Sequence, residues 1–227
     1  SYVYFGYSGS EKTVKQALIF SHGFGVKADA RGMFLEIAAA FPDYEAVMFD
    51  YNGILPNGDT VVAPLDEQAK KLQEVLNRTD ADEIILVCHS QGSIIAGLVS
   101  LSKVSKVILL APPVVASMQR VIDKVAKRPG AVLNLDGISK LPRTDGTTTL
   151  LPKEYIASLD AVDPLELYKK VANDKPTVII RATEDQVLGM TNVDEVGAAT
   201  LIDLPADHDF TGESREELIK ALEEVIV

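Results

Sequence analysis

The segment from Glu83 to Leu98 most constrains the fold of this chain, because it changes from strand to helix within a few residues. Ile84 to Val87 form a short apolar run, which is typical of a strand buried on both faces. From residue 91 onward, apolar residues recur at helical spacing. The sequence therefore predicts a strand–turn–helix unit, with Ser90 at the turn.

A turn of this kind gives the serine the surroundings of a nucleophile. It raises the hydroxyl above the sheet, and the backbone amide of Gln91, at a helix N-terminus, points toward developing negative charge. Small residues must flank the serine because the strand and the helix pass close to each other. Gly92 meets this requirement, whereas Cys88 stands where the usual G-x-S-x-G pattern has its first glycine. The pentapeptide is a weak signal by itself, so the rest of the chain decides.

Composition excludes several classes of protein. The 227 residues suit one domain with a sizeable core, or one domain with an insertion. A formal net charge of −11 makes nucleic acid and anionic membranes poor partners, because their phosphates would be repelled. A single cysteine excludes an internal disulfide, and no apolar run approaches the ~20 residues of a membrane span. The N-terminal residues lack the pattern of a signal peptide, so we expect a cytoplasmic protein.

Strands and helices alternate along most of the chain. We expect strands at residues 14–21, 45–50, 104–111, 177–182 and 200–204, with an edge strand at 2–7 and a loop at 51–64. We expect helices at 33–41, 65–76, 163–171, 192–199 and 215–227. This alternation predicts the α/β class, with a mostly parallel sheet and helices on both faces.

The alternation breaks after Pro112 and Pro113. Residues 114–125 have the apolar spacing of a helix, and Asp145-Gly146 is a hairpin-type turn signal. We therefore expect residues 114–159 to form a small cap insertion, and residues 1–113 and 160–227 to form the core. By topology this cap lies over or beside Ser90 and supplies much of the pocket wall.

A serine nucleophile needs a base, and the chain contains three histidines. His89 is part of the turn itself, and His22 ends a strand. His208 lies between the last strand and the last helix, in a loop that should emerge on the same side of the sheet as Ser90. We therefore predict His208 as the base. Glu184 and Asp185 follow another strand at the same edge, and either carboxylate could orient that histidine.

The run His22-Gly23-Phe24-Gly25 follows a strand and precedes a helix. Glycines allow the backbone to turn an amide toward a substrate oxygen, so we predict an oxyanion hole formed by the backbone amides of Phe24 and Gln91. The chain lacks the glycine motifs of nucleotide-binding folds. It also lacks ligand pairs with the spacing of a metal site. We therefore expect neither a cofactor nor a metal.

Four motifs in register, HGFG, CHSQG, ATEDQVL and ADHDF, make almost the whole chain resemble the α/β-hydrolase superfamily. The resemblance implies the order Ser90, Asp185, His208 for a catalytic triad, and it favours Asp185 over Glu184. Within the superfamily the chain looks like small bacterial esterases, namely cinnamoyl (feruloyl) esterases and monoacylglycerol-lipase-like enzymes. Similar proteins carry a cap of this size. Polar cap residues of cinnamoyl esterases recognise the phenolic ring, a role that Tyr155 would match.

The sequence thus predicts a serine hydrolase that cleaves carboxylic esters of small acyl or aryl groups through an acyl-enzyme on Ser90. The expected partner is a small-molecule ester. A thioesterase or an amidase would use the same triad. The superfamily also contains ligand receptors and scaffolds that catalyse no hydrolysis, so a binding protein is the alternative from another class.

Overall fold

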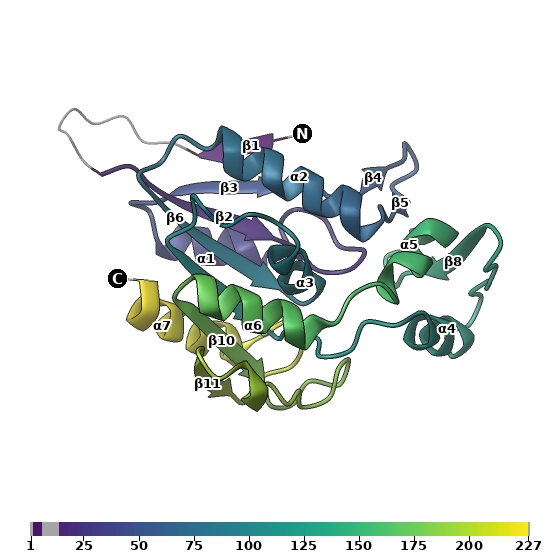
Figure 1. Cartoon of the computed structure of the whole chain (residues 1–227). Helices are drawn as coiled ribbons and strands as arrows, with labels where there is room; N and C mark the ends of the chain where they lie inside the picture. Colours follow the sequence, from purple (N-terminus) through teal and green to yellow (C-terminus); the bar gives the residue numbers. More distant parts are fainter. Residues whose placement is uncertain (1, 6–13, 227) are drawn as a thin grey trace.

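A computed structural model of the protein describes residues 2–5 and 14–226. Its main sheet has seven strands in the order β1-β3-β2-β6-β7-β10-β11 (Figure 1). Strand β1 is antiparallel to β3, and the other strands are parallel, as predicted. The edge strand expected at 2–7 is present over residues 2–5, and residues 6 and 7 lie outside the described residues. The bounds are β1 Tyr2–Phe5, β2 Gln16–Ser21, β3 Glu45–Phe49, β6 Glu83–His89, β7 Lys106–Leu110, β10 Thr177–Ala182 and β11 Thr200–Leu204.

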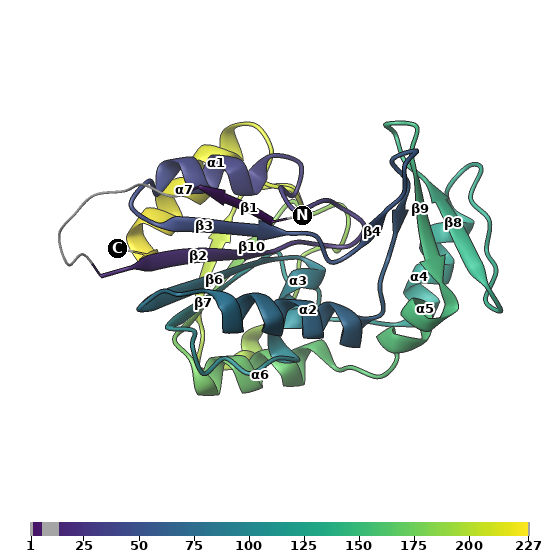
Figure 2. The same cartoon turned by 90° about the horizontal axis from the view of Figure 1, so that it is seen from above.

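Helices cover both faces of this sheet (Figure 2). Helices α1 (Met33–Ala40) and α7 (Glu213–Ile226) cover one face, and α2 (Leu65–Arg78), α3 (Gln91–Gly97) and α6 (Pro164–Asp174) cover the other. Successive side chains of a strand point to opposite faces. Leu18 and Phe20 accordingly pack in the cluster with α1 and α7, while Ala17 and Ile19 pack in the cluster with α2, α3 and α6. Within residues 2–5 and 14–226, no helix has the length and apolar character needed to cross a bilayer.

A second, smaller sheet lies beside the main one, in the order β4-β5-β9-β8 (Figure 2). Strands β8 (Ile138–Pro142) and β9 (Thr148–Pro152) form the hairpin that the Asp145-Gly146 signal predicts. Helices α4 (Met118–Ala126) and α5 (Lys153–Leu159) flank them. The segment predicted as a loop at 51–64 supplies β4 (Gly53–Ile54) and β5 (Thr60–Val61), and β5 pairs with β9. Strands of two residues are too short to have a detectable hydrophobic period.

Two helix predictions differ from the structure. The helix expected from residue 114 begins at residue 118, because Ser117 is its N-cap and accepts a hydrogen bond from the Arg120 amide. The helix expected at 192–199 is a single 3₁₀ turn, Asp194–Val196. It stops at Gly197, which has a φ of 64°.

The turn between β6 and α3 brings the backbone at the start of α3 close to the backbone at the end of β2. Ser90 has a φ of 53° and a ψ of −122°, a conformation that L residues rarely adopt. Its amide donates to the Leu110 carbonyl over 2.9 Å. A Cβ on Gly92 would lie 2.1 Å from the Ser21 carbonyl oxygen. Cys88 is fully buried in the core, so a small side chain is tolerated at this position.

We expect Gly92→Ala to lower the free energy of unfolding by about 1–3 kcal/mol, since the new methyl group overlaps backbone that cannot rotate away. Urea denaturation followed by circular dichroism measures the change. Gly53→Ala is the matched control, because a Cβ there first meets Val61 Cβ at 3.7 Å. Equal stability of the two variants would contradict the close approach.

Candidate active site

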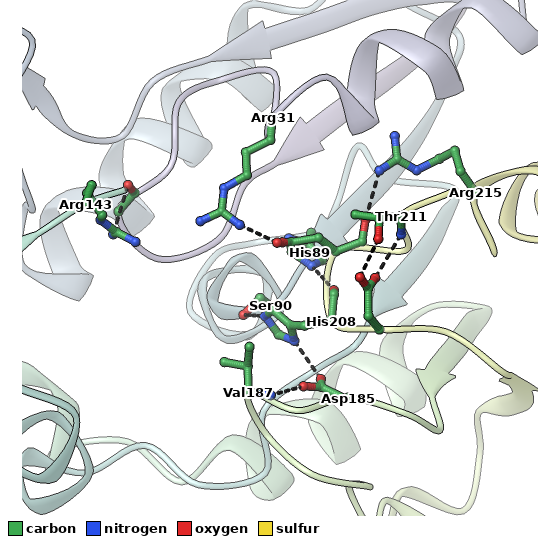
Figure 3. Close-up of polar contacts among 12 residues, drawn as sticks. Arg31, His89, Ser90, Arg143, Asp185, Val187, His208, Thr211 and Arg215 are labelled. Atoms are coloured by element: carbon green, nitrogen blue, oxygen red, sulfur yellow. Dashed lines mark hydrogen bonds and ion pairs between the residues drawn. The ribbon is translucent and has the colours of Figure 1, made fainter. Parts of the chain in front are cut away.

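Three loops bring Ser90, Asp185 and His208 together at the carboxyl edge of the main sheet (Figure 3). Ser90 lies between β6 and α3, Asp185 follows β10, and His208 lies between β11 and α7. The Ser90 Oγ and His208 Nε2 atoms are 3.0 Å apart, and His208 Nδ1 lies 2.6 Å from Asp185 Oδ2. Because the carboxylate can only accept, Nδ1 carries the ring proton and Nε2 is left to accept from the serine hydroxyl.

The carboxylate of Asp185 is held on both oxygens. Its second oxygen, Oδ1, accepts from the amides of Val187 at 2.7 Å and Leu188 at 2.8 Å. Burial alone would raise the pKa of Asp185. The hydrogen bonds from His208 and from the Leu188 and Val187 amides outweigh burial and lower that pKa below its usual value. Asp185 is therefore ionised at neutral pH. The neighbouring Glu184 has an exposed side chain.

The loop that carries His208 is fixed by a buried arginine and an aspartate. Arg215 Nε donates to the Phe210 carbonyl at 2.8 Å, and its Nη2 donates to the Asp209 carbonyl at 2.9 Å (Figure 3). Asp207 accepts from the Thr211 amide at 2.8 Å. These bonds hold a tight turn in which Phe210 has a φ of 50°. Sequence reasoning did not identify Arg215, because it lies on the amphipathic helix α7, where an arginine is usually solvated.

The other two histidines have structural partners. The His22 Nε2 atom accepts from the Tyr51 amide at 3.1 Å, and its Nδ1 donates to the Gly23 carbonyl at 2.9 Å. The His89 Nε2 donates to the backbone carbonyl of His208 at 2.8 Å. His89 therefore contacts the loop of the predicted base, which the sequence did not reveal.

The two residues predicted to donate to an oxyanion lie beside Ser90. Gln91 is the first residue of α3, so its amide has no acceptor within the helix. Phe24 lines the same pocket, and its ring stacks on that of Tyr155 with centroids 5.6 Å apart.

The Tyr155 hydroxyl donates to Gln91 Oε1 at 2.7 Å. Gln91 Nε2 in turn donates to Gln68 Oε1 at 3.0 Å, and Gln68 Nε2 donates to the Ala63 carbonyl at 2.6 Å. A buried chain of hydrogen bonds thus joins α5 to the start of α3. The ring of Tyr155 lines the pocket, and its hydroxyl is directed at Gln91. The hydroxyl proton is thus used within the protein. The contact of Tyr155 with a phenolic substrate stays a prediction, with the bond to Gln91 as the competing role.

A pocket of about 180 Å³ opens above Ser90. Its walls are mostly apolar and come from the loops and helix α3 at the edge of the main sheet and from the segment 114–159, including Val121, Leu141, Leu151 and Leu159. Ser90 and His208 are among its polar lining residues. Among residues 2–5 and 14–226, no group of three or more His, Cys, Asp or Glu side chains is arranged to hold a metal.

The fold and the pocket together define the chain as an α/β-hydrolase-fold protein, in agreement with solved structures of that fold. The esterase Est1E from Butyrivibrio proteoclasticus, in a structure with bound ferulic acid, is similar with a TM-score of 0.68 at 16% identity. That match covers 99% of this chain and 94% of Est1E.

Two further structures match over nearly the whole of both chains. The monoacylglycerol lipase of Paleococcus ferrophilus has a TM-score of 0.67 at 15% identity, covering 100% of this chain and 97% of the lipase. The enol-lactonase of Burkholderia xenovorans has a TM-score of 0.64 at 13% identity, covering 100% and 95%. No protein-family model and no curated protein sequence matches the chain. These likenesses establish the fold, and the activity has to be argued from the site.

We expect His89 to make the protein sensitive to acid. Burial, and then the charge of His208, lower the pKa of His89 from about 6.5 to about 4. The folded state therefore binds fewer protons than the unfolded state between these values. The contribution of His89 to the free energy of unfolding is fully present above about pH 6.5 and is lost as the pH drops toward 4.

The variant His89→Gln, whose amide can still donate to the His208 carbonyl, should show a shallower loss of unfolding free energy between pH 7 and 4.5. Urea denaturation at several pH values measures both curves. The pKa of His22 is also lowered by burial, and this contribution is present in both proteins. Parallel curves would show that His89 is not the group that titrates.

Proposed function

We propose that the protein is a serine hydrolase that cleaves small carboxylic esters, with Ser90, His208 and Asp185 as its catalytic triad. The observation that carries this proposal is the unbroken chain of contacts from Ser90 Oγ to His208 Nε2 at 3.0 Å and from His208 Nδ1 to Asp185 Oδ2 at 2.6 Å. The positive φ of Ser90 supports the same role, since strained backbone is retained where neighbouring structure over-determines it.

In the proposed mechanism, the Ser90 oxygen attacks the ester carbonyl while His208 Nε2 accepts the hydroxyl proton. Asp185 stabilises the imidazolium through the bond to Nδ1. The tetrahedral intermediate collapses, and His208 returns the proton to the departing alcohol. This leaves an acyl-enzyme on Ser90. A water molecule, deprotonated by His208, then attacks the acyl carbonyl. The second tetrahedral intermediate collapses, the bond from Ser90 Oγ to the acyl carbon breaks, and His208 returns the proton to Ser90 Oγ as the acid leaves.

The oxyanion of each tetrahedral intermediate would accept from the backbone amides of Phe24 and Gln91. Both residues line the pocket with Ser90. The Gln91 side chain accepts from Tyr155 and donates to Gln68. These two hydrogen bonds restrict the residue, which supports a fixed direction for its backbone amide.

The segment 114–159 serves as a cap in this proposal, with residues 1–113 and 160–227 as the core. The β5–β9 pairing attaches the short strands at 53–61 to the same unit. The pocket size and its apolar walls favour a short acyl chain or a single ring. The likeness to Est1E, whose structure holds ferulic acid, supports an aryl ester as one candidate substrate.

We expect Ser90→Ala and His208→Ala each to lower kcat by roughly 10³-fold or more, because members of a triad act as a unit. Hydrolysis of a p-nitrophenyl ester measures the loss, and a fluorophosphonate adduct on Ser90 identifies the nucleophile by mass spectrometry. An adduct on another residue, or ester binding without turnover in the native protein, would exclude the proposed mechanism. The second result would favour a receptor.

The carboxylates at 184 and 185 form a matched control pair. Asp185→Asn should lower kcat strongly, because the amide cannot hold His208 in the required tautomer. Glu184→Gln changes an exposed side chain and should leave kcat close to that of the native protein. The reverse ranking would assign the acid to Glu184. Comparing kcat/KM for an ester, a thioester and an amide that share one acyl group shows which of the three bonds the protein cleaves best.

We expect Tyr155→Phe to lower kcat/KM for a phenolic ester and for a short p-nitrophenyl ester by similar factors of up to about tenfold. The hydroxyl donates its one proton to Gln91, so its loss affects every substrate that uses the Gln91 amide. Tyr44→Phe, remote from the pocket, is the control. A loss confined to the phenolic ester would instead assign the Tyr155 hydroxyl to substrate recognition.

A further inference from the structure

Cationic side chains gather around the Ser90 pocket, although the formal net charge of the chain is −11. Arg31, Arg120 and Arg143 line that pocket. A second cavity of about 590 Å³ adjoins it and shares Val26, Arg31 and Arg143 with it. Lys27 and Arg128 line this second cavity as well. We call it, with Lys27, Arg31, Arg128 and Arg143, the basic cleft.

The acidic residues that line the two cavities neutralise these cations only in part. Arg31 pairs with Asp209, beside His208 (Figure 3). Asp29 and Asp145 also line the basic cleft. Among the described residues, however, no carboxylate forms an ion pair with Lys27, Arg128 or Arg143.

Arg143 is held in place by neutral groups. Its Nε donates to Thr149 Oγ1 at 2.6 Å, and its Nη2 donates to the Gly25 carbonyl at 3.1 Å. Its guanidinium lies 5.6 Å from the centroid of the Phe24 ring. These contacts fix the guanidinium between the β8–β9 hairpin and the Phe24 loop, where it lines the Ser90 pocket with no ion-pair partner among the described residues.

The cations of the basic cleft repel one another. Burial lowers the pKa of Arg143, and the charges of Arg31 and Arg128 lower it further, while Asp145 and Asp209 oppose the shift. A bound anion would relieve this repulsion. Guanidinium groups suit the task, because they are weakly hydrated and their N–H groups match the oxygens of carboxylates and phosphates.

We infer that the substrate carries an anionic group, a carboxylate or a phosphate, which extends from the ester past Arg143 into the basic cleft. This inference rests on ester hydrolysis at Ser90 as proposed above. The ligand is a small molecule, because a polyanion such as nucleic acid would be repelled by the net negative charge of the rest of the protein. Arg143 and Arg128 set specificity for the charged group.

Two pairs of esters test the inference, each matched in size and differing in one carboxylate. For the acyl side, p-nitrophenyl hexanoate is compared with mono-p-nitrophenyl adipate. For the alcohol side, 2-nitrophenyl butyrate is compared with 3-butyryloxy-4-nitrobenzoate. In at least one pair, kcat/KM should be about tenfold or more higher for the anionic ester, mainly through KM. The advantage should shrink as salt is added.

Arg128→Gln should reduce this preference three- to tenfold and leave the neutral esters within a factor of two. Arg143→Gln should reduce the preference as well, but it also removes the bonds to Thr149 and Gly25 and should therefore slow the neutral esters too. Within residues 2–5 and 14–226, no hydrogen bond or ion pair engages the Arg128 side chain, and its backbone bonds at the end of α4 survive the substitution, so Arg128→Gln separates recognition from folding. Lys15→Gln removes an exposed, remote cation that pairs with Asp80, and it should keep the full preference. Neutral esters hydrolysed as well as or better than both anionic partners would overturn the inference while leaving the proposed hydrolysis intact.

A binding measurement makes the result independent of turnover. Calorimetry with Ser90→Ala compares benzoate and phenyl phosphate with neutral benzyl alcohol, and it distinguishes the two kinds of anion. Tighter binding of an anion, lost in the Ser90→Ala, Arg128→Gln double variant, supports the basic cleft even if no ester is cleaved. That combination would refute only the proposed hydrolysis. Equal binding of the anions and the alcohol would overturn the inference.

Discussion

The backbone turn at Ser90 is the constraint on which the rest of the structure depends. A left-handed φ at a residue other than glycine costs on the order of 1–3 kcal/mol, so surrounding contacts must hold it. Strand β6 is paired on both sides, with β2 and β7, and the Ser90 amide is bonded to Leu110. Gly92 allows α3 to leave the strand against the Ser21 carbonyl. The central position of β6 therefore makes the turn possible.

The segment 114–159 and the core are joined by polar contacts that end at the pocket. The Tyr155–Gln91–Gln68 chain links α5 to α3, and Arg143 links the β8–β9 hairpin to the Gly25 carbonyl. The first connection reaches Gln91, the residue after Ser90, and the second reaches Gly25, the residue after Phe24. A displacement of the cap would thus be felt at Gln91 and Phe24, the residues proposed to bind the oxyanion. The position of the proposed cap and the geometry of the proposed catalytic site are therefore linked.

The charges of this protein are distributed unevenly, because cationic side chains gather at the pocket although the net charge of the chain is negative. The overall excess of acidic residues disfavours nucleic acid and anionic membranes as partners. At the pocket the balance is reversed, because Arg31, Arg128 and Arg143 come from three separate segments and meet in one cleft. Ionic interactions are strongest where water is partly excluded. In the proposed enzyme, the local charge would therefore have more influence on substrate choice than the charge of the whole chain.

The sequence by itself determined the alternation of strands and helices, because buried parallel strands and amphipathic helices have distinct hydrophobic periods. It also singled out Ser90 and His208, with Glu184 and Asp185 as alternative acids, since parallel strands place their carboxyl ends at one edge. The resemblance to α/β hydrolases favoured Asp185. The tertiary structure alone decided the pairing of β5 with β9, the bond from Tyr155 to Gln91, the support of His208 by His89 and Arg215, and the basic cleft. Each of these joins residues distant in the sequence through side chains or two-residue strands, and such contacts leave no local period or motif from which they could be predicted.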